Sequence, residues 1–142
     1  MNNQIILVRG NTYVIDTGMS YIPFYRINEE EIVMLDSGWA HEREIIDKVL
    51  EENNFKVAGI INSHAHVDHV GNNAYLKRKY LSVIAMSSHE AVICSSAVSL
   101  KVYYSNINLS MVEDHMKEMI CDTDIIITDD QNKIYVCGIK FG

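Results

Sequence analysis

A short apolar run that leads straight into a cluster of polar side chains constrains the fold of this chain most. Residues 57–61 read Val-Ala-Gly-Ile-Ile, a run with the length and β-branched content of a buried strand. Residues 64–69 then read His-Ala-His-Val-Asp-His. In α/β proteins a site usually lies on the loops at the carboxyl ends of such strands. We therefore expect an α/β fold with a site on this loop.

The spacing within this loop suits metal binding. In an extended chain, residues two apart point to the same side, so His64 and His66 can bind one ion together. Asp68 and His69 follow where the chain should turn into a helix over residues 74–80, and from that turn they can face a second ion nearby. Imidazole and carboxylate groups are good ligands for zinc and other first-row metals. The competing interpretation, an ordinary polar loop in a chain with six histidines, needs a coincidence that this composition makes rare.

Two segments of the chain resemble the metallo-β-lactamase superfamily. Residues 63–71, Ser-His-Ala-His-Val-Asp-His-Val-Gly, are similar to its signature T-H-x-H-x-D-H-x-G-G, with Ser63 in place of Thr and Asn72 in place of the second Gly. Residues 35–38, Leu-Asp-Ser-Gly, resemble the family's strand that ends in D-T-G or D-S-G. The order of elements also matches, so the resemblance covers roughly residues 4–90 well and the remainder in outline.

The resemblance implies half of an αβ/βα four-layer sandwich, in which a mixed, mostly antiparallel sheet carries helices on its outer face. Family members usually exceed 200 residues and consist of two similar halves, whereas this chain has 142 residues. The second half supplies a further His, a bridging Asp and a last His, and none of these is visible here. We therefore expect residues 1–142 to be a single domain, the N-terminal part of the family fold, with the C-terminal half absent.

The resemblance also implies that the parent protein is a metal-dependent hydrolase. His64 and His66 would bind the first metal ion, and Asp68 and His69 the second. Asp68 would be the catalytic residue of this set, and Asp36 would orient the loop through a hydrogen bond from outside the ligand shell. A metal-bound hydroxide would attack a carbonyl or phosphoryl centre of a small-molecule substrate. Zinc is the expected cofactor, with two ions in the complete protein, and iron or manganese are the alternatives.

Two other functions stay open. Some relatives are persulfide dioxygenases, oxidoreductases that use a single iron held by the same first histidines, and metal analysis would separate that reaction from zinc hydrolysis. The chain could also be a truncated, non-catalytic fragment, which a comparison of its activity with that of the longer chain would reveal. Continuous apolar runs such as residues 57–61 and 125–127 are expected when both faces of a sheet are buried. We therefore expect the chain to be inactive alone and to pair with its missing half or with a second copy.

Composition narrows the choice of partners and location. The formal charge of −7, with no basic stripe to offset it, argues against a nucleic-acid partner. The three cysteines are odd in number and contain no C-x-x-C motif, which favours free thiols in a reducing compartment. No signal peptide or transmembrane stretch is evident, so a cytoplasmic protein without a membrane contact is expected.

Local patterns predict the secondary structure. The expected antiparallel strands are 5–8, 13–16, 21–27 and 32–35, and the expected amphipathic helix is 42–53. After a strand at 82–86, capping boxes at Ser87 and Ser110 should each open a helix, the first reaching toward residue 97. Residues 125–128 and 133–139 should then form a hairpin around the turn at 129–132.

Several other residues are candidates for functional roles that ordinary structural roles explain as well or better. Trp39 could form one side of the site or pack beside the D-S-G loop. Tyr103 and Tyr104 could line a substrate cleft or face solvent. The three remaining histidines are each expected in a structural setting: His41 at the surface or in a cap, His89 in solvent, and His115 on the apolar face of a helix.

Overall fold

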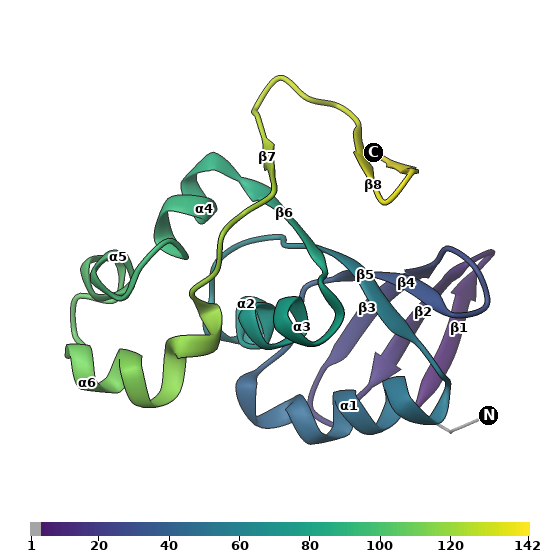
Figure 1. Cartoon of the computed structure of the whole chain (residues 1–142), viewed down its shortest axis with the longest axis horizontal. Helices are drawn as coiled ribbons and strands as arrows, with labels where there is room; N and C mark the ends of the chain where they lie inside the picture. Colours follow the sequence, from purple (N-terminus) through teal and green to yellow (C-terminus); the bar gives the residue numbers. More distant parts are fainter. Residues whose placement is uncertain (1–3) are drawn as a thin grey trace.

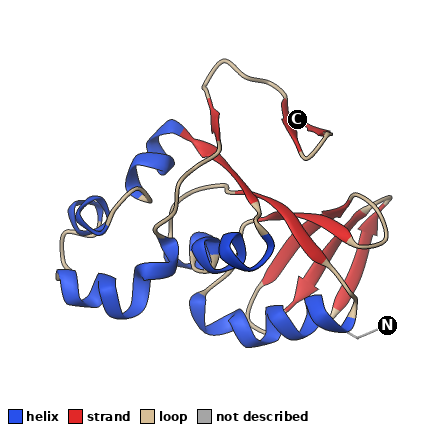
Figure 2. Ribbon diagram, viewed as in Figure 1, coloured by secondary structure: helices blue, strands red, loops and turns tan. Residues whose placement is uncertain are grey.

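A seven-stranded sheet with helices packed on one face forms the centre of the computed structural model, which describes residues 4–142 (Figures 1 and 2). The strands lie side by side in chain order. Their bounds are β1 Ile5–Arg9, β2 Thr12–Asp16, β3 Tyr21–Arg26, β4 Glu31–Leu35, β5 Lys56–Ile61, β6 Val83–Ser87 and β7 Ile125–Ile127. This mixed sheet confirms the fold class predicted from the sequence.

The pairing between neighbouring strands changes from antiparallel to parallel at β4, and the site lies at the edge of the sheet where the parallel strands end. Strands β1 to β4 are antiparallel and are joined by short turns, whereas β4 to β7 run parallel. Parallel neighbours need crossover connections, which are helical here. The carboxyl ends of β4 to β6 therefore meet at one edge of the sheet, and the D-S-G segment and the histidine loop follow directly from two of them.

The helices lie in these crossovers. Their bounds are α1 Arg43–Glu52, α2 Val67–Val70, α3 Asn73–Tyr80, α4 Ser88–Ile93, α5 Ala97–Tyr103 and α6 Leu109–Met111. A 3-10 turn at Ala40–Glu42 precedes α1, and a π-helical turn at Val112–Met116 and a 3-10 turn at Lys117–Met119 follow α6. No helix among residues 4–142 is long and apolar enough to cross a membrane.

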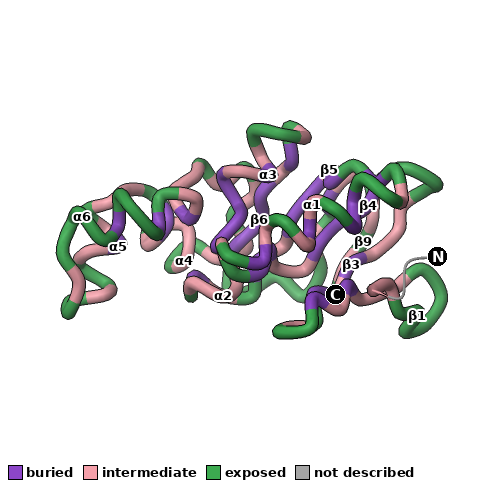
Figure 3. Tube along the Cα trace, turned by 90° about the horizontal axis from the view of Figure 1, so that it is seen from below, coloured by how far each residue is buried: buried purple, intermediate pink, exposed green. Residues whose placement is uncertain are grey.

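The main hydrophobic core lies between the sheet and the helices. Apolar residues alternate along the strands, so that every second side chain faces α1 and α3. The fully buried members include Phe24, Met34, Ile60 and Ile84 from the sheet, and Ile46, Leu50 and Leu76 from the helices. Burial is densest over the sheet and is lower toward α5 and α6, where much of the chain is exposed (Figure 3).

A small hairpin covers part of the opposite face of the sheet. It consists of β8 Ile134–Val136 and β9 Ile139–Phe141, and its Val136 packs with Val33 and Ala85. The predicted hairpin of residues 125–128 with 133–139 is therefore wrong, because β7 pairs in parallel with β6 instead. The actual turn is Cys137-Gly138, both with positive φ (51° and 79°), as a two-residue hairpin turn of the primed type requires.

The rest of this face is open and apolar. Ile6, Val14 and Pro23 lie opposite one another across β1, β2 and β3. Ile6 is 43% exposed, and Val8 and Tyr21 are 61% and 67% exposed. Contiguous apolar area of this kind typically marks an interaction surface.

The capping predictions are partly wrong. Ser87 does cap α4, but that helix ends at Ile93, and Ser96 begins α5 as a separate helix. The next cap is Asn108, whose side chain accepts the N–H of Met111 at 2.9 Å. Ser110 instead donates a hydrogen bond to Asn108, and the helix starts two residues earlier than a cap at Ser110 would place it.

Candidate metal centre

Backbone hydrogen bonds join the D-S-G segment to the histidine loop. Ser37 N–H donates to His69 O at 2.7 Å, and Gly71 N–H donates to Gly38 O at 3.0 Å. A side chain at Gly71 would lie only 2.6 Å from Gly38 O and 2.7 Å from Ala40 N, which explains why glycine occupies this position. The two segments therefore form one unit at the edge of the sheet.

Hydrogen bonds among buried amide and hydroxyl groups support this unit. Ser37 Oγ donates to Asn73 Oδ1 at 2.8 Å, and Asn73 Nδ2 donates to Asn62 Oδ1 at 2.7 Å. Asn72 donates to the carbonyls of Ser37 and Trp39 at 2.8 and 2.7 Å. All three asparagines are buried. Asn72, which replaces a family glycine, thus cross-links the two loops, and a satisfied buried network of this kind is rigid.

Asp36 lies beneath the histidine loop in a left-handed backbone conformation (φ 65°). Its Oδ1 accepts the backbone N–H of Ser63 at 2.8 Å, and its Oδ2 accepts the hydroxyl of Ser63 at 2.7 Å. The same Oδ2 lies 2.8 Å from Nδ1 of His69. The single carboxylate therefore contacts both ends of the loop.

The structure brings the predicted ligands together on one side of the loop. The ring centroid of His64 lies 4.5 Å from that of His66 and 3.9 Å from that of His69. Asp68 approaches from the first turn of α2, where its Oδ2 is 3.2 Å from Nε2 of His69. The extended backbone at His66, which precedes α2, presents the first two rings side by side.

Neighbouring groups favour one tautomer of His64 and face both ring nitrogens of His69. The hydroxyl of Ser63 donates to Asp36, so it can only accept from Nδ1–H of His64, 2.9 Å away. The carboxylate of Asp36 likewise takes Nδ1–H of His69. Nε2 of His64 is then unprotonated in the neutral ring, which is the form that binds metal ions, whereas Nε2 of His69 faces Oδ2 of Asp68 at 3.2 Å.

The side chains of His64, His66, Asp68 and His69 carry the donor atoms that metal ions prefer, but they are not arranged around a common centre. Nε2 of His69 and Oδ2 of Asp68 lie 3.2 Å apart, and either a proton or a metal ion between them would satisfy both groups. As the side chains stand, however, no group of three or more His, Cys, Asp or Glu residues within 4–142 is arranged to hold an ion. The imidazoles contact one another instead of surrounding a common centre.

Side chains of α4 and of the end of α5 form hydrogen bonds with the other side of the histidine loop. The carboxylate of Glu90 accepts the backbone N–H of Ala65, and the hydroxyl of Tyr104 donates to Ala65 O at 3.3 Å. Burial raises the pKa of Tyr104 to about 12, so its hydroxyl stays protonated. Tyr103 OH lies 2.8 Å from Nε2 of His66. Glu90 is the fourth residue of the capping box that begins at Ser87, and its contact with Ala65, 25 residues away, leaves no local signal in the sequence.

The remaining histidines lie outside this cluster. His41 packs on Trp39 with ring centroids 5.1 Å apart, and His89 is exposed, as predicted. His115 is exposed, so the prediction that it lies on the apolar face of its helix is wrong. Trp39, His41 and His115 line a hollow of about 300 Å³ together with Val67 of the loop.

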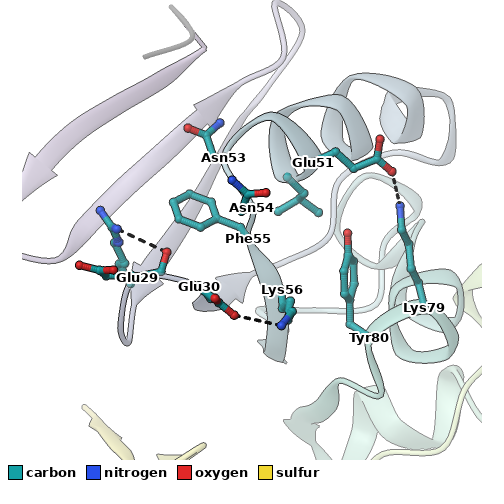
Figure 4. Close-up of a pocket in the computed structure, with 11 residues that line it drawn as sticks. Glu29, Glu30, Glu51, Asn53, Asn54, Phe55, Lys56, Lys79 and Tyr80 are labelled. Carbon is teal, nitrogen blue, oxygen red and sulfur yellow. Dashed lines mark hydrogen bonds and ion pairs between the residues drawn. The ribbon is translucent and has the colours of Figure 1, made fainter.

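A wider hollow lies at the opposite end of β5. It has a volume of about 730 Å³ and is lined mainly by polar residues of α1, α3 and the β3–β4 turn (Figure 4). Two ion pairs lie within it: Lys56 lies 3.0 Å from Glu30, and Lys79 lies 3.0 Å from Glu51 (Figure 4). This hollow lies at the end of β5 away from the histidine loop, so it is not part of the candidate metal centre.

A mixed sheet with outer helices and a histidine-rich loop at the end of a parallel strand defines the class of this protein. The chain belongs to the metallo-beta-lactamase superfamily, whose family model matches residues 2–102. This match confirms the resemblance seen in the sequence. No curated protein matches the chain.

Solved structures support the same fold. FEZ-1 metallo-beta-lactamase from Legionella gormanii aligns with a TM-score of 0.73 at 15% identity, over 96% of this chain and 50% of its own. A beta-lactamase from Chitinophaga pinensis gives 0.71 at 18% identity, over 96% and 49%. BJP-1, a subclass B3 metallo-beta-lactamase of Bradyrhizobium japonicum, gives 0.68 at 15%, over 96% and 49%. The chain thus spans about half the length of these structures.

Proposed function

We propose that this chain forms the metal-binding half of a metal-dependent hydrolase. The observation that carries the proposal is the grouping of His64, His66, Asp68 and His69 on one side of a loop held by Asp36. Oriented imidazoles with one nitrogen engaged by a supporting group are the usual form of protein ligands to zinc. Membership of the family supports the same function.

Each residue of the loop would have its own role in metal binding. His64 and His66 would hold one zinc ion, and Asp68 with His69 a second. The bound metal would supply Lewis-acid activation of water and of the group under attack. Asp68, which faces His69 and is partly exposed, would be the group nearest the incoming substrate. Asp36 would keep His69 in one tautomer and one orientation.

A second folded unit would complete the site. The loop offers four ligands, and the open sheet face with Ile6, Val8 and Tyr21 offers an apolar surface on which another half or another copy could pack. If it does, Val8→Lys should reduce self-association of the 142-residue chain in light scattering, whereas the exposed but remote Val98→Lys should not. A clean monomer of the unaltered chain would contradict this pairing.

The hydrolase proposal is tested by assaying the 142-residue chain and the whole polypeptide that its gene encodes, with and without zinc. Substrates should include a β-lactam, a thioester, a lactone and a phosphodiester, because the residues above do not select among them. We expect zinc-dependent hydrolysis by the whole polypeptide, its loss in Asp68→Ala, and negligible turnover by the 142-residue chain. Retention of iron with persulfide oxidation would instead favour the oxidoreductase, and no metal-dependent reaction at all would refute both.

A further inference from the structure

A tyrosine at the end of α5 engages one ring nitrogen of His66. Tyr103 OH lies 2.8 Å from Nε2 of His66, and the ring centroids are 6.0 Å apart. Within residues 4–142, no hydrogen bond reaches Nδ1 of His66. His64 and His69 have their supporting groups in Ser63 and Asp36, so Tyr103 is the group that takes this place for His66.

Tyr103 is 45% exposed, and its ring is supported on one side by Tyr104. Its ring stands perpendicular to that of Tyr104, with centroids 4.9 Å apart. Tyr104 in turn donates to Ala65 O, while Glu90 accepts Ala65 N–H. The peptide units on both sides of residue 65 are therefore held by α4 and α5, directly beside the ring that Tyr103 contacts.

We propose that Tyr103 is a positioning residue for His66, an inference that rests on the proposed metal-binding function. Tyr103 OH accepts the Nε2–H of His66, which leaves Nδ1 unprotonated and free to bind the ion shared with His64. The physical basis is general: the hydrogen bond made by one nitrogen of an imidazole decides which nitrogen binds the metal. Removal of the hydroxyl should therefore free the ring to adopt either tautomer and to rotate.

The first arm of the test uses the metal-free 142-residue chain, labelled with 15N in its histidines. At a pH where His66 is neutral, its ring signals should show a dominant Nε2–H tautomer in the unaltered chain and in Tyr135→Phe, a control at an exposed tyrosine of β8. In Tyr103→Phe the ratio of the two tautomers should shift toward that of a free neutral histidine side chain, while the unfolding midpoint stays unchanged. A dominant Nδ1–H tautomer in the unaltered chain would overturn the proposal, as would an unchanged tautomer in Tyr103→Phe.

The second arm measures zinc affinity of the same three chains by competition with a chromogenic chelator. Tyr103→Phe should weaken zinc binding roughly 10–100-fold, the usual effect of losing a group that supports a metal ligand. A changed tautomer with unchanged zinc affinity would overturn the proposal. If the unaltered chain binds no zinc, the proposed function fails, and the tautomer comparison still decides whether Tyr103 sets the state of His66.

Discussion

Oδ2 of Asp36 lies 2.8 Å from Nδ1 of His69, across 33 positions in the sequence. The same carboxylate accepts two hydrogen bonds from Ser63, at the other end of the histidine loop. The loop is therefore fixed at both ends by a side chain that would not itself bind the metal. This arrangement leads to the first of the predictions below.

Replacement of Asp36 should weaken metal binding more than it weakens the fold. Asp36→Ala should lower zinc affinity roughly 10–100-fold, because His69 and Ser63 both lose the group that orients them. Asp36→Asn tolerates the left-handed backbone at this position, so it separates the loss of charge from backbone strain. Chelator competition would measure the affinities, with Asp129→Ala in the exposed 129–132 turn as control. An affinity equal to that of the control would count against the role of Asp36.

A buried carboxylate, Glu42, should contribute strongly to stability. It is fully buried and accepts hydrogen bonds from Thr17 Oγ1 at 2.5 Å, Ser20 Oγ at 2.6 Å and Trp39 N–H at 2.7 Å. Glu42→Ala would leave these donors without an acceptor and should lower the free energy of unfolding by about 3 kcal/mol or more. Urea unfolding would measure the change against Glu44→Ala, an exposed position on α1. A loss no larger than the control's would show that the network adds little.

Gly71 should tolerate no side chain. The Cβ of an alanine would lie 2.6 to 2.7 Å from three backbone atoms, Gly38 O, Ala40 N and Val67 O, so the two loops would have to separate. We expect Gly71→Ala to cost about 1–3 kcal/mol of stability, as overpacking does, and to weaken zinc binding as well. Gly18→Ala is the comparison, because there an alanine meets backbone strain at a φ of 82° but no atom within 4 Å, whereas Gly71 has a φ of −60° and only the close contacts. Thermal unfolding of both variants should show the larger loss at Gly71, and the opposite order would be inconsistent with this packing.

The buried thiols should make stability fall at alkaline pH. Burial raises the pKa of Cys94 to about 12 and the pKa of Cys121 to about 11, whereas thiols of the unfolded chain ionise near pH 8.5. The unfolded state therefore loses protons first as the pH rises, so this contribution is complete below about pH 8.5 and is lost toward pH 11 and 12. At pH 8, Cys94 should react with iodoacetamide far more slowly in the native chain than in urea. Equal rates would show that the thiol is not protected.

The sequence was sufficient for elements with strong local patterns. Strands β1 to β5 and helix α1 end within a few residues of their predicted bounds, because alternation and amphipathic spacing report directly which face is buried. The grouping of the site residues was also predictable, since Asp36 and the histidine loop follow adjacent parallel strands. The roles of these residues in metal binding stay predictions.

The errors arose where distant contacts override local signals. The three-residue strand β7 has no alternation to specify its neighbour, and the polar residues 129–132 suggested a hairpin that pairing with β6 rules out. His115 was misplaced because the chain forms a π-helical turn at Val112–Met116. In this turn Val112 and Met116 are buried while His115 is exposed, a distribution that a periodicity of 3.6 residues does not anticipate.

Titration of the 142-residue chain with zinc, followed through the NMR signals of its six histidine rings, tests the central claim most directly. The loop histidines should respond together, and the three others serve as controls within the same molecule. We expect the signals of His64, His66 and His69 to change by the first equivalents of zinc, while those of His41, His89 and His115 stay in place. Equal shifts of all six rings, or no change in the loop rings at millimolar zinc, would contradict a metal centre at this loop.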